Sequence, residues 1–182
     1  MPDVAVPWLS PWAVVGVGNR GTGRIIMPKV LVVDDEADIV NLLVDDLSDD
    51  GFDVISADNG ATALDQIYRE QPDVVLLDLM MPVLTGYEVL RELRSDPTTK
   101  NLPVIVITAV SPVVGEHAAV EFGANHYVTK AWEPGALQAV IRVALREAGS
   151  SGWVKPSVSR FRNVTQFHVN QLIPHSAWRR RF

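Results

Sequence analysis

The segment Lys29-Val-Leu-Val-Val-Asp-Asp-Glu36 joins an apolar run of strand length to a pair of adjacent carboxylates. A second segment of the same kind, Asp73-Val-Val-Leu-Leu-Asp78, also ends in an aspartate. Nearly continuous runs of valine and leucine are typical of parallel strands that are buried on both faces of a sheet. We therefore predict two buried parallel strands, each of which presents acidic side chains at its carboxyl end.

The same alternation of strand and helix patterns continues outward from these two segments. Strands are expected at residues 29–33, 53–57, 73–77, 102–108 and 125–129. A helix is expected after each strand, the last two over residues 112–122 and 133–147. The first three helices have inward-facing apolar residues at a helical period: Ile39, Leu42, Leu43 and Leu47, then Ala63, Leu64 and Ile67, then Val89, Leu90 and Leu93. Gly51 should end the first helix and Asn59 should cap the second. This alternation predicts a doubly wound α/β domain with five parallel strands and five helices.

Polar side chains stand where four of the predicted strands end. They are Asp34 with Asp35, then Asp78, Thr108 and Lys130. The carboxyl ends of parallel strands lie on one edge of a sheet, where α/β folds place their sites, so we expect these side chains to converge. Three carboxylates brought together repel one another unless a cation neutralises them, and oxygen ligands suit Mg²⁺. With a hydroxyl and an ammonium group beside them, they predict a site for Mg²⁺ and a phosphoryl group.

These segments, together with Asp73-Val-Val-Leu-Leu-Asp-Leu-Met-Met-Pro82 and Gly123-Ala-Asn-His-Tyr-Val-Thr-Lys130, closely resemble the receiver domain of two-component response regulators. The resemblance covers about residues 28–148 and is closest to the stand-alone, chemotaxis-regulator-like kind. It implies a flavodoxin-like sheet with strand order 2-1-3-4-5. It also implies that a sensor histidine kinase or a histidine phosphotransfer protein donates a phosphoryl group to this chain.

The resemblance assigns a role to each site residue. Asp78 would be the nucleophile that becomes an aspartyl phosphate. Ligands for Mg²⁺ would come from Asp34, Asp35, Asp78 and the backbone carbonyl of Met80, and phosphoryl oxygens would be bound by Thr108, Lys130 and the backbone N–H of Ala109. Thr108 and Tyr127 would act as the switch, reshaping a face formed by residues 112–122, Tyr127 and residues 133–145 for an unidentified downstream protein. The chain is thus expected to be a phosphoacceptor that assists its own phosphotransfer and autodephosphorylation, and not a turnover enzyme.

Two departures from the family pattern concern the rate of this chemistry. After Lys130 the family usually has proline and an aromatic residue, whereas this chain has Ala131 and Trp132. A trans bond before Ala131 is expected, because a non-proline cis bond costs about 2.5–4 kcal/mol, and it could misaim Lys130. Met80 and Val110, which would flank the phosphoryl group, are apolar and orient an attacking water poorly. We therefore expect slow self-dephosphorylation.

Composition limits the other classes of function. The chain has 182 residues and no cysteine, which excludes disulfides and thiolate metal sites. No apolar run approaches the roughly 20 residues that a membrane span needs, and the N-terminus lacks the pattern of a secretory signal, so the cytoplasm is expected. The net charge of −6 is uneven: residues 29–148 carry 8 basic and 21 acidic residues. Such an acidic domain is not expected to bind nucleic acid itself.

The two ends lie outside the resemblance. Residues 1–27 are expected to be a disordered extension because of their proline and glycine content. Its Gly16-Val-Gly-Asn-Arg-Gly21 matches a dinucleotide-binding fingerprint, but the chain leaves no room for the helix that this motif requires. Residues 149–182 are expected to be a linker and a disordered basic tail. A sharper alternative is that the tail docks on an acidic partner, on nucleic acid or on the receiver's own acidic face.

Two other functions compete with this one. A DNA-binding transcriptional regulator would need an output in the tail or in a missing domain, and the acidic core disfavours it. An aspartyl-phosphate phosphohydrolase of the haloacid-dehalogenase kind would have a second aspartate two residues after the nucleophile, where this chain has Met80. Phosphorylation-dependent dimerisation is left open.

Overall fold

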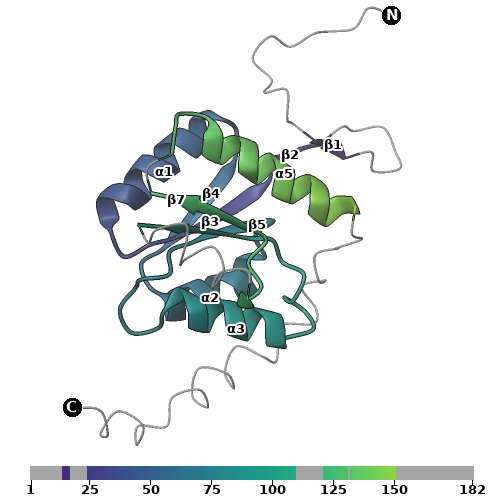
Figure 1. The fold of residues 1–182 in the computed structure, drawn as a ribbon. Helices are drawn as coiled ribbons and strands as arrows, with labels where there is room; N and C mark the ends of the chain where they lie inside the picture. Colours follow the sequence, from purple (N-terminus) through teal and green to yellow (C-terminus); the bar gives the residue numbers. More distant parts are fainter. Residues whose placement is uncertain (1–13, 17–23, 110–120, 131, 151–182) are drawn as a thin grey trace, which may run out of the picture.

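The computed structural model describes residues 14–16, 24–109, 121–130 and 132–150. Their main body is a five-stranded parallel sheet in the order β4-β3-β5-β6-β7 (Figure 1). In order along the chain its strands are β3 (Lys29–Val33), β4 (Asp53–Ala57), β5 (Val74–Leu77), β6 (Val104–Thr108) and β7 (His126–Thr129). The predicted order 2-1-3-4-5 is therefore confirmed. The first two strands match their predicted bounds, and the other three begin one or two residues later than predicted.

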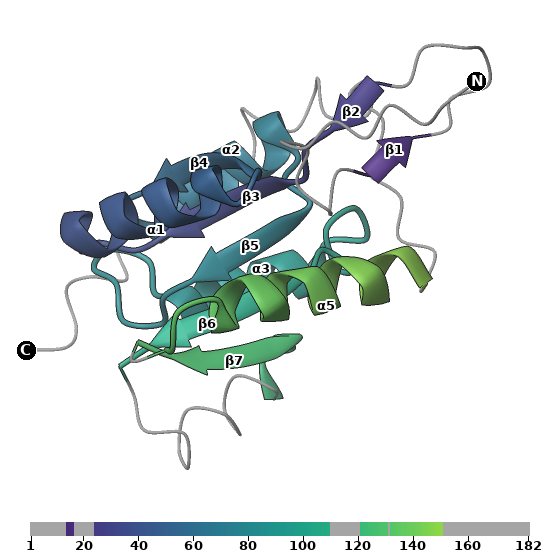
Figure 2. The same ribbon diagram turned by 90° about the horizontal axis from the view of Figure 1, so that it is seen from above.

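Helices cover both faces of the sheet, as Figures 1 and 2 show. On one face lie α1 (Ala37–Asp49) and α5 (Ala136–Ser150), and on the other lie α2 (Gly60–Glu70) and α3 (Gly86–Ser95). Each face has its own apolar cluster, because alternate residues of the buried strands point to opposite sides. The last helix begins and ends three residues later than predicted. Most of the expected helix 112–122 lies outside the described residues.

The helix ends follow the predicted chemistry. The side chain of Asn59 accepts a hydrogen bond from the N–H of Thr62 at 2.9 Å and so caps α2. Gly51 follows α1 with a φ of 85°, a left-handed conformation that glycine adopts without a steric penalty. Both residues therefore hold the positions expected from the sequence.

The inward face of α1 was predicted wrongly at one position. Leu43 and Leu47 are buried against the sheet, and Ile39 is partly buried, but the side chain of Leu42 is 58% exposed. Successive helical residues are about 100° apart, so Leu42 cannot share the face that Leu43 presents to the sheet. Leu42 instead lies on the solvent side of the helix.

One further element precedes the domain. Strands β1 (Val14–Gly16) and β2 (Arg24–Ile26) pair antiparallel with each other, within the extension expected to be disordered. A strand at Arg24–Ile26 fits the view that no nucleotide-binding helix follows the glycine motif.

The proposed domain limits stay a prediction, since much of residues 1–27 and nearly all of the tail lie outside the described residues. No helix in the described part of the chain is long and apolar enough to cross a membrane.

Candidate functional site

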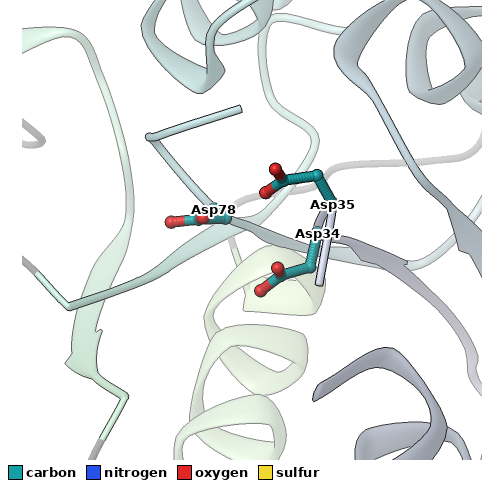
Figure 3. Close-up of side chains that lie close together, drawn as sticks. All are labelled: Asp34, Asp35 and Asp78. Atoms are coloured by element: carbon teal, nitrogen blue, oxygen red, sulfur yellow. The ribbon is translucent and has the colours of Figure 1, made fainter. Parts of the chain in front are cut away.

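Three carboxylates meet at the carboxyl edge of the sheet (Figure 3). Asp34 follows β3 and Asp78 follows β5, which are neighbouring strands paired at Val33 and Leu77. Backbone bonds extend this pairing, since the N–H of Asp78 donates to the carbonyl of Val33 at 2.9 Å. One carboxylate oxygen from each of Asp34, Asp35 and Asp78 lies within 4.8 Å of the others. The predicted convergence of these residues is thus what the structure shows.

Lys130 places its ammonium group among these carboxylates. Its Nζ lies 2.9 Å from Oδ2 of Asp34, 3.2 Å from Oδ2 of Asp78 and 2.7 Å from Oε1 of Glu36. Burial alone would lower the pKa of Lys130, but the hydrogen bonds and charges of the surrounding carboxylates outweigh it and raise the pKa above its ordinary value. The lysine therefore stays charged at neutral pH and is the counter-ion of the cluster in this structure.

Asp34 is buried, and burial raises its pKa above the ordinary 3.8. The charge of Lys130 and the backbone N–H of Glu36, which donates to Oδ1 of Asp34 at 3.0 Å, act in the opposite direction without cancelling the burial. In the metal-free protein, burial therefore makes the charged form of Asp34 less favourable than it would be in water.

Asp78 is also buried, and its carboxylate is held at both oxygens. Oδ1 accepts the N–H of Leu79 at 2.8 Å, while Oδ2 accepts the ammonium of Lys130. The turn after Asp78 leads into α3, whose first residue, Gly86, donates its N–H to the carbonyl of Leu79 at 3.1 Å. The start of α3 thus supports the backbone that aims Asp78.

The capping box at the start of α3 fixes this support. The N–H of Glu88 donates to Oγ1 of Thr85, and the carboxylate of Glu88 accepts the N–H of Thr85 at 2.9 Å. Two N–H groups that a helix start would leave without partners are satisfied in this way. The start of α3 is therefore held by reciprocal hydrogen bonds next to the site.

Thr108 and Lys130 are joined through the sheet. Thr108 is the last residue of β6, is fully buried, and pairs with Thr129 of β7. Its carbonyl accepts the backbone N–H of Lys130 at 3.0 Å, so both residues lie at the same edge as Asp78. Ala109 follows Thr108 and is exposed. Tyr127 is partly buried within β7 and packs against the core cluster that α2 and α3 cover.

Two features of the site were not anticipated. Glu36, whose carboxylate makes the shortest contact to Lys130, is not among the predicted site residues. Only its adjacency to the acidic pair could have pointed to it. Gly86 was also missed, since nothing in the sequence shows that it touches Asp78. Val110 and Ala131 lie outside the described residues.

The donor set fits a hard divalent cation. Three carboxylates within 4.8 Å of one another supply only oxygen ligands, the kind that Mg²⁺ prefers. The side chain of Met80 is 65% exposed and points away from the core, which leaves the carbonyl of this residue as its only ligand group. Asp34, Asp35 and Asp78 are thus the side chains that could hold Mg²⁺.

A pocket of about 300 Å³ opens beside the carboxylates. It lies between the start of α1, the end of β4 and the start of α2, with Asp35, Asn41, Asp58 and Thr62 in its lining. The cluster is therefore reached by solvent from the side of Asp35, the one exposed carboxylate of the three.

Curated relatives match this part of the chain. A protein of Porphyridium aerugineum named "Probable transcriptional regulator ycf27" is 47% identical over 118 residues, covering 65% of this chain and 48% of that protein. The protein of the same name in Guillardia theta is 42% identical over 125 residues, covering 69% of this chain and 48% of that protein. The chain thus spans about half of the length of these relatives.

Solved structures match the same part of the chain. The Vibrio cholerae chemotaxis protein CheY4 superposes with a TM-score of 0.62 at 28% identity, over 65% of this chain and 99% of that protein. NtrX from Brucella abortus gives a TM-score of 0.64 at 29% identity, over 70% of this chain but only 29% of that protein. The sequence model of the protein family "Response regulator receiver domain" matches residues 30–142 of this chain. With its sheet order, its acidic cluster and this match, the chain belongs to the response regulator receiver family.

Proposed function

We propose that this receiver accepts a phosphoryl group on Asp78 and transmits the change through its surface. The observation that carries the proposal is the setting of the Asp78 carboxylate. It is buried, oriented by the N–H of Leu79, in contact with Lys130 and within 4.8 Å of Asp34 and Asp35. A lone surface aspartate would have none of these partners.

The chemistry assigned to the site is phosphoryl transfer. An oxygen of Asp78 attacks the phosphorus of a phosphohistidine, the P–N bond breaks, and its electron pair leaves with the imidazole nitrogen of the donor. The product is an acyl phosphate on Asp78. When bound, Mg²⁺ supplies positive charge that offsets the carboxylates and the transferring phosphoryl oxygens. Lys130 would bind a phosphoryl oxygen, and Thr108 and the N–H of Ala109 would donate the remaining hydrogen bonds.

The site favours a timed switch over a turnover enzyme. Hydrolysis requires a water to attack the phosphorus while the Asp78 oxygen leaves with the bonding electrons and inorganic phosphate is released. Met80, two residues after Asp78, offers no side-chain base for this water. The aspartyl phosphate is thus proposed to persist long enough for Thr108 and Tyr127 to reshape the β7–α5 face for a downstream protein. The donor is proposed to be a histidine kinase or phosphotransfer protein of the cytoplasm.

Intact mass spectrometry tests this proposal. The full chain is incubated with acetyl phosphate and Mg²⁺ beside an Asp78→Asn variant. One phosphoryl adduct on the wild type, absent without Mg²⁺ and absent from the variant, is the expected result. A folded wild type that gains no adduct, or a variant that gains the same adduct, would refute the assignment of Asp78.

A role in transcription is the second candidate, because the curated relatives carry the name of transcriptional regulators and are about twice as long as the matched region. Residues 29–148 carry a net charge of −13, so DNA contacts would have to come from other parts of the polypeptide. The basic tail with Arg179, Arg180 and Arg181 is one source within this chain. Salt-sensitive retention of the full chain on duplex DNA, lost when these three arginines are changed to alanine, would support this role.

A further inference from the structure

The ammonium group of Lys130 has all of its donors in use. An ammonium has three N–H donors and no acceptor. In this structure three carboxylates surround it: Asp34 at 2.9 Å, Glu36 at 2.7 Å and Asp78 at 3.2 Å. An incoming phosphoryl oxygen can bind Lys130, while Asp78 is still a carboxylate, only if one of these contacts is given up. The proposed function, on which this inference rests, therefore requires that one of the three carboxylates release the ammonium group of Lys130.

Burial separates the three partners. Asp34 and Asp78 are buried, and each has a second hydrogen bond from a backbone N–H, that of Glu36 and that of Leu79 respectively. The side chain of Glu36 is 61% exposed. Water can replace Lys130 as the partner of Glu36 at little cost, whereas either buried aspartate would be left with an uncompensated charge. Glu36 is therefore the partner that can leave.

The local structure of α1 supports this distinction. Glu36 is the N-cap residue of α1, and its side chain makes no capping hydrogen bond. Asn59 and Thr85, the N-cap residues of α2 and α3, both accept a backbone N–H of their own helix. The side chain of Glu36 instead reaches a residue 94 positions away in the chain. Its role thus lies with Lys130 and not with the helix that it begins.

We infer that Glu36 is a positioning residue that holds Lys130 before phosphorylation and releases it to the phosphoryl group. It acts as a competitor for the lysine in the unphosphorylated receiver. Removal of its charge should vacate one N–H of Lys130, so that an incoming phosphoryl oxygen can bind there without displacing a carboxylate. Until then Lys130 should hold Asp34 and Asp78 more tightly, which makes these two carboxylates less available to a metal ion.

Two measurements on the full chain test the inference with Glu36→Gln, which keeps the size of the side chain. The first is calorimetric titration with Mg²⁺ in the absence of a phosphodonor. The second is the rate of adduct formation with acetyl phosphate at saturating Mg²⁺, followed by intact mass. Asp38→Asn is the matched control, because Asp38 is an exposed acid in the first turn of the same helix and makes no described contact with Lys130.

The two measurements should move in opposite senses. For Glu36→Gln, Mg²⁺ should bind more weakly than to Asp38→Asn, while phosphorylation at saturating Mg²⁺ should become about two- to fivefold faster, the range for loss of an exposed ion pair. Asp38→Asn should be phosphorylated at the wild-type rate. A simple loss of negative charge would weaken Mg²⁺ binding in both variants and accelerate neither.

The outcomes separate this inference from the proposed function. A phosphorylated wild type with a Glu36→Gln variant that is no faster overturns the role of Glu36 and leaves Asp78 as the acceptor. A wild type that takes no phosphoryl group overturns the proposed function, and the Mg²⁺ titration then decides the role of Glu36 alone. If the titration shows that Glu36→Gln weakens Mg²⁺ binding no more than Asp38→Asn does, the proposed role of Glu36 is overturned.

Discussion

The α-carbon of Gly86 lies directly against the backbone carbonyl of Asp78. A β-carbon at residue 86 would overlap the carbonyl oxygen of Asp78 and lie 2.8 Å from the α-carbon of Leu79. The backbone at Asp78, the candidate phosphoacceptor, can therefore follow its observed path only because residue 86 has no side chain. The first turn of α3 can approach the end of β5 only because residue 86 is glycine.

Gly86→Ala should consequently destabilise the domain and displace Asp78. Because the clash is with backbone and not with a flexible side chain, we expect a loss of about 1–3 kcal/mol in the free energy of unfolding, measured by urea denaturation. Phosphorylation by acetyl phosphate should fall in molecules that remain folded. Gly149→Ala is the control, since no atom would meet its β-carbon. Equal stability of the two variants would contradict the role of Gly86.

Much of the fold was predictable because its signals are local. The strands are continuous apolar runs, Asn59 and Gly51 mark helix ends, and the site residues stand at strand ends that a parallel sheet brings together. Leu42 was misplaced because apolar residues at 42 and 43 both fit a helical period, and only packing on the sheet decides which one faces inward. Local patterns thus identify the elements but not every buried face.

The unpredicted parts of the site depend on long-range contacts. Glu36 and Lys130 are 94 residues apart, and no pattern in the sequence pairs them. The contact between Gly86 and Asp78 depends on the angle at which α3 returns to the sheet, which the sequence around α3 does not encode in a readable way. These two contacts depend on how the helices and strands pack against one another, and not on the tendency of each segment to form a helix or a strand.

Loss of the ammonium at residue 130 should destabilise the metal-free protein. In Lys130→Met, Asp34 and Asp78 would stay buried without their counter-ion, and we expect a loss of about 3 kcal/mol in the free energy of unfolding. Mg²⁺ should restore more stability to this variant than to the wild type, because the lysine no longer competes for the carboxylates. Denaturant titrations with and without Mg²⁺ measure both effects.

The control for this prediction is Lys29→Met. Lys29 pairs with Glu70 at 3.0 Å, but both side chains are more exposed than those of Lys130, Asp34 and Asp78. Its loss should cost less than about 1 kcal/mol. A Lys130→Met variant as stable as Lys29→Met in the absence of Mg²⁺ would show that the buried aspartates do not need Lys130.

Stabilisation by Mg²⁺ should depend on pH through Asp34. Its pKa is raised above 3.8 chiefly by burial, so the folded protein takes up this proton at a higher pH than the unfolded chain does. In the metal-free protein the contribution of Asp34 to stability is least above its raised pKa and grows as the pH falls toward 3.8. A protonated Asp34 cannot bind a cation. The stabilisation by Mg²⁺ should therefore shrink as the pH falls from the raised pKa of Asp34 toward 3.8, while the contribution of Asp34 to the stability of the metal-free protein grows.

Thermal unfolding at fixed ionic strength checks this pH dependence. At neutral pH, a Mg²⁺ concentration 100 times the dissociation constant should add about 2.7 kcal/mol to the free energy of unfolding. The increment should decline before the pH reaches 3.8. An increment that is constant from neutral pH down to 3.8 would mean that Asp34 is not a ligand.

Val83 should be a site where substitution stabilises the protein. It is a β-branched residue with a φ of 69°, in a three-residue turn closed by the N–H of Leu84 and the carbonyl of Pro82 at 2.8 Å. Its side chain is 64% exposed, so little packing offsets the strain of the left-handed backbone. Glycine adopts a positive φ without a steric penalty, and Val83→Gly should gain about 0.5–1 kcal/mol in the free energy of unfolding. A loss of stability in urea denaturation would show that the turn is not strained.

Met80 should make the aspartyl phosphate long-lived. It lies two residues after Asp78, is 65% exposed, and its thioether can neither donate a strong hydrogen bond to an attacking water nor accept one from it. Met80→Asn places an amide at this position and should speed hydrolysis about tenfold, which corresponds to about 1.4 kcal/mol in activation free energy. The decay of the phosphoryl adduct after removal of acetyl phosphate measures both lifetimes. Met27→Asn, an exposed methionine at the start of the domain, is the control and should decay like the wild type. A wild-type adduct that disappears within seconds would contradict the prediction, because a water would then be oriented without any help from residue 80.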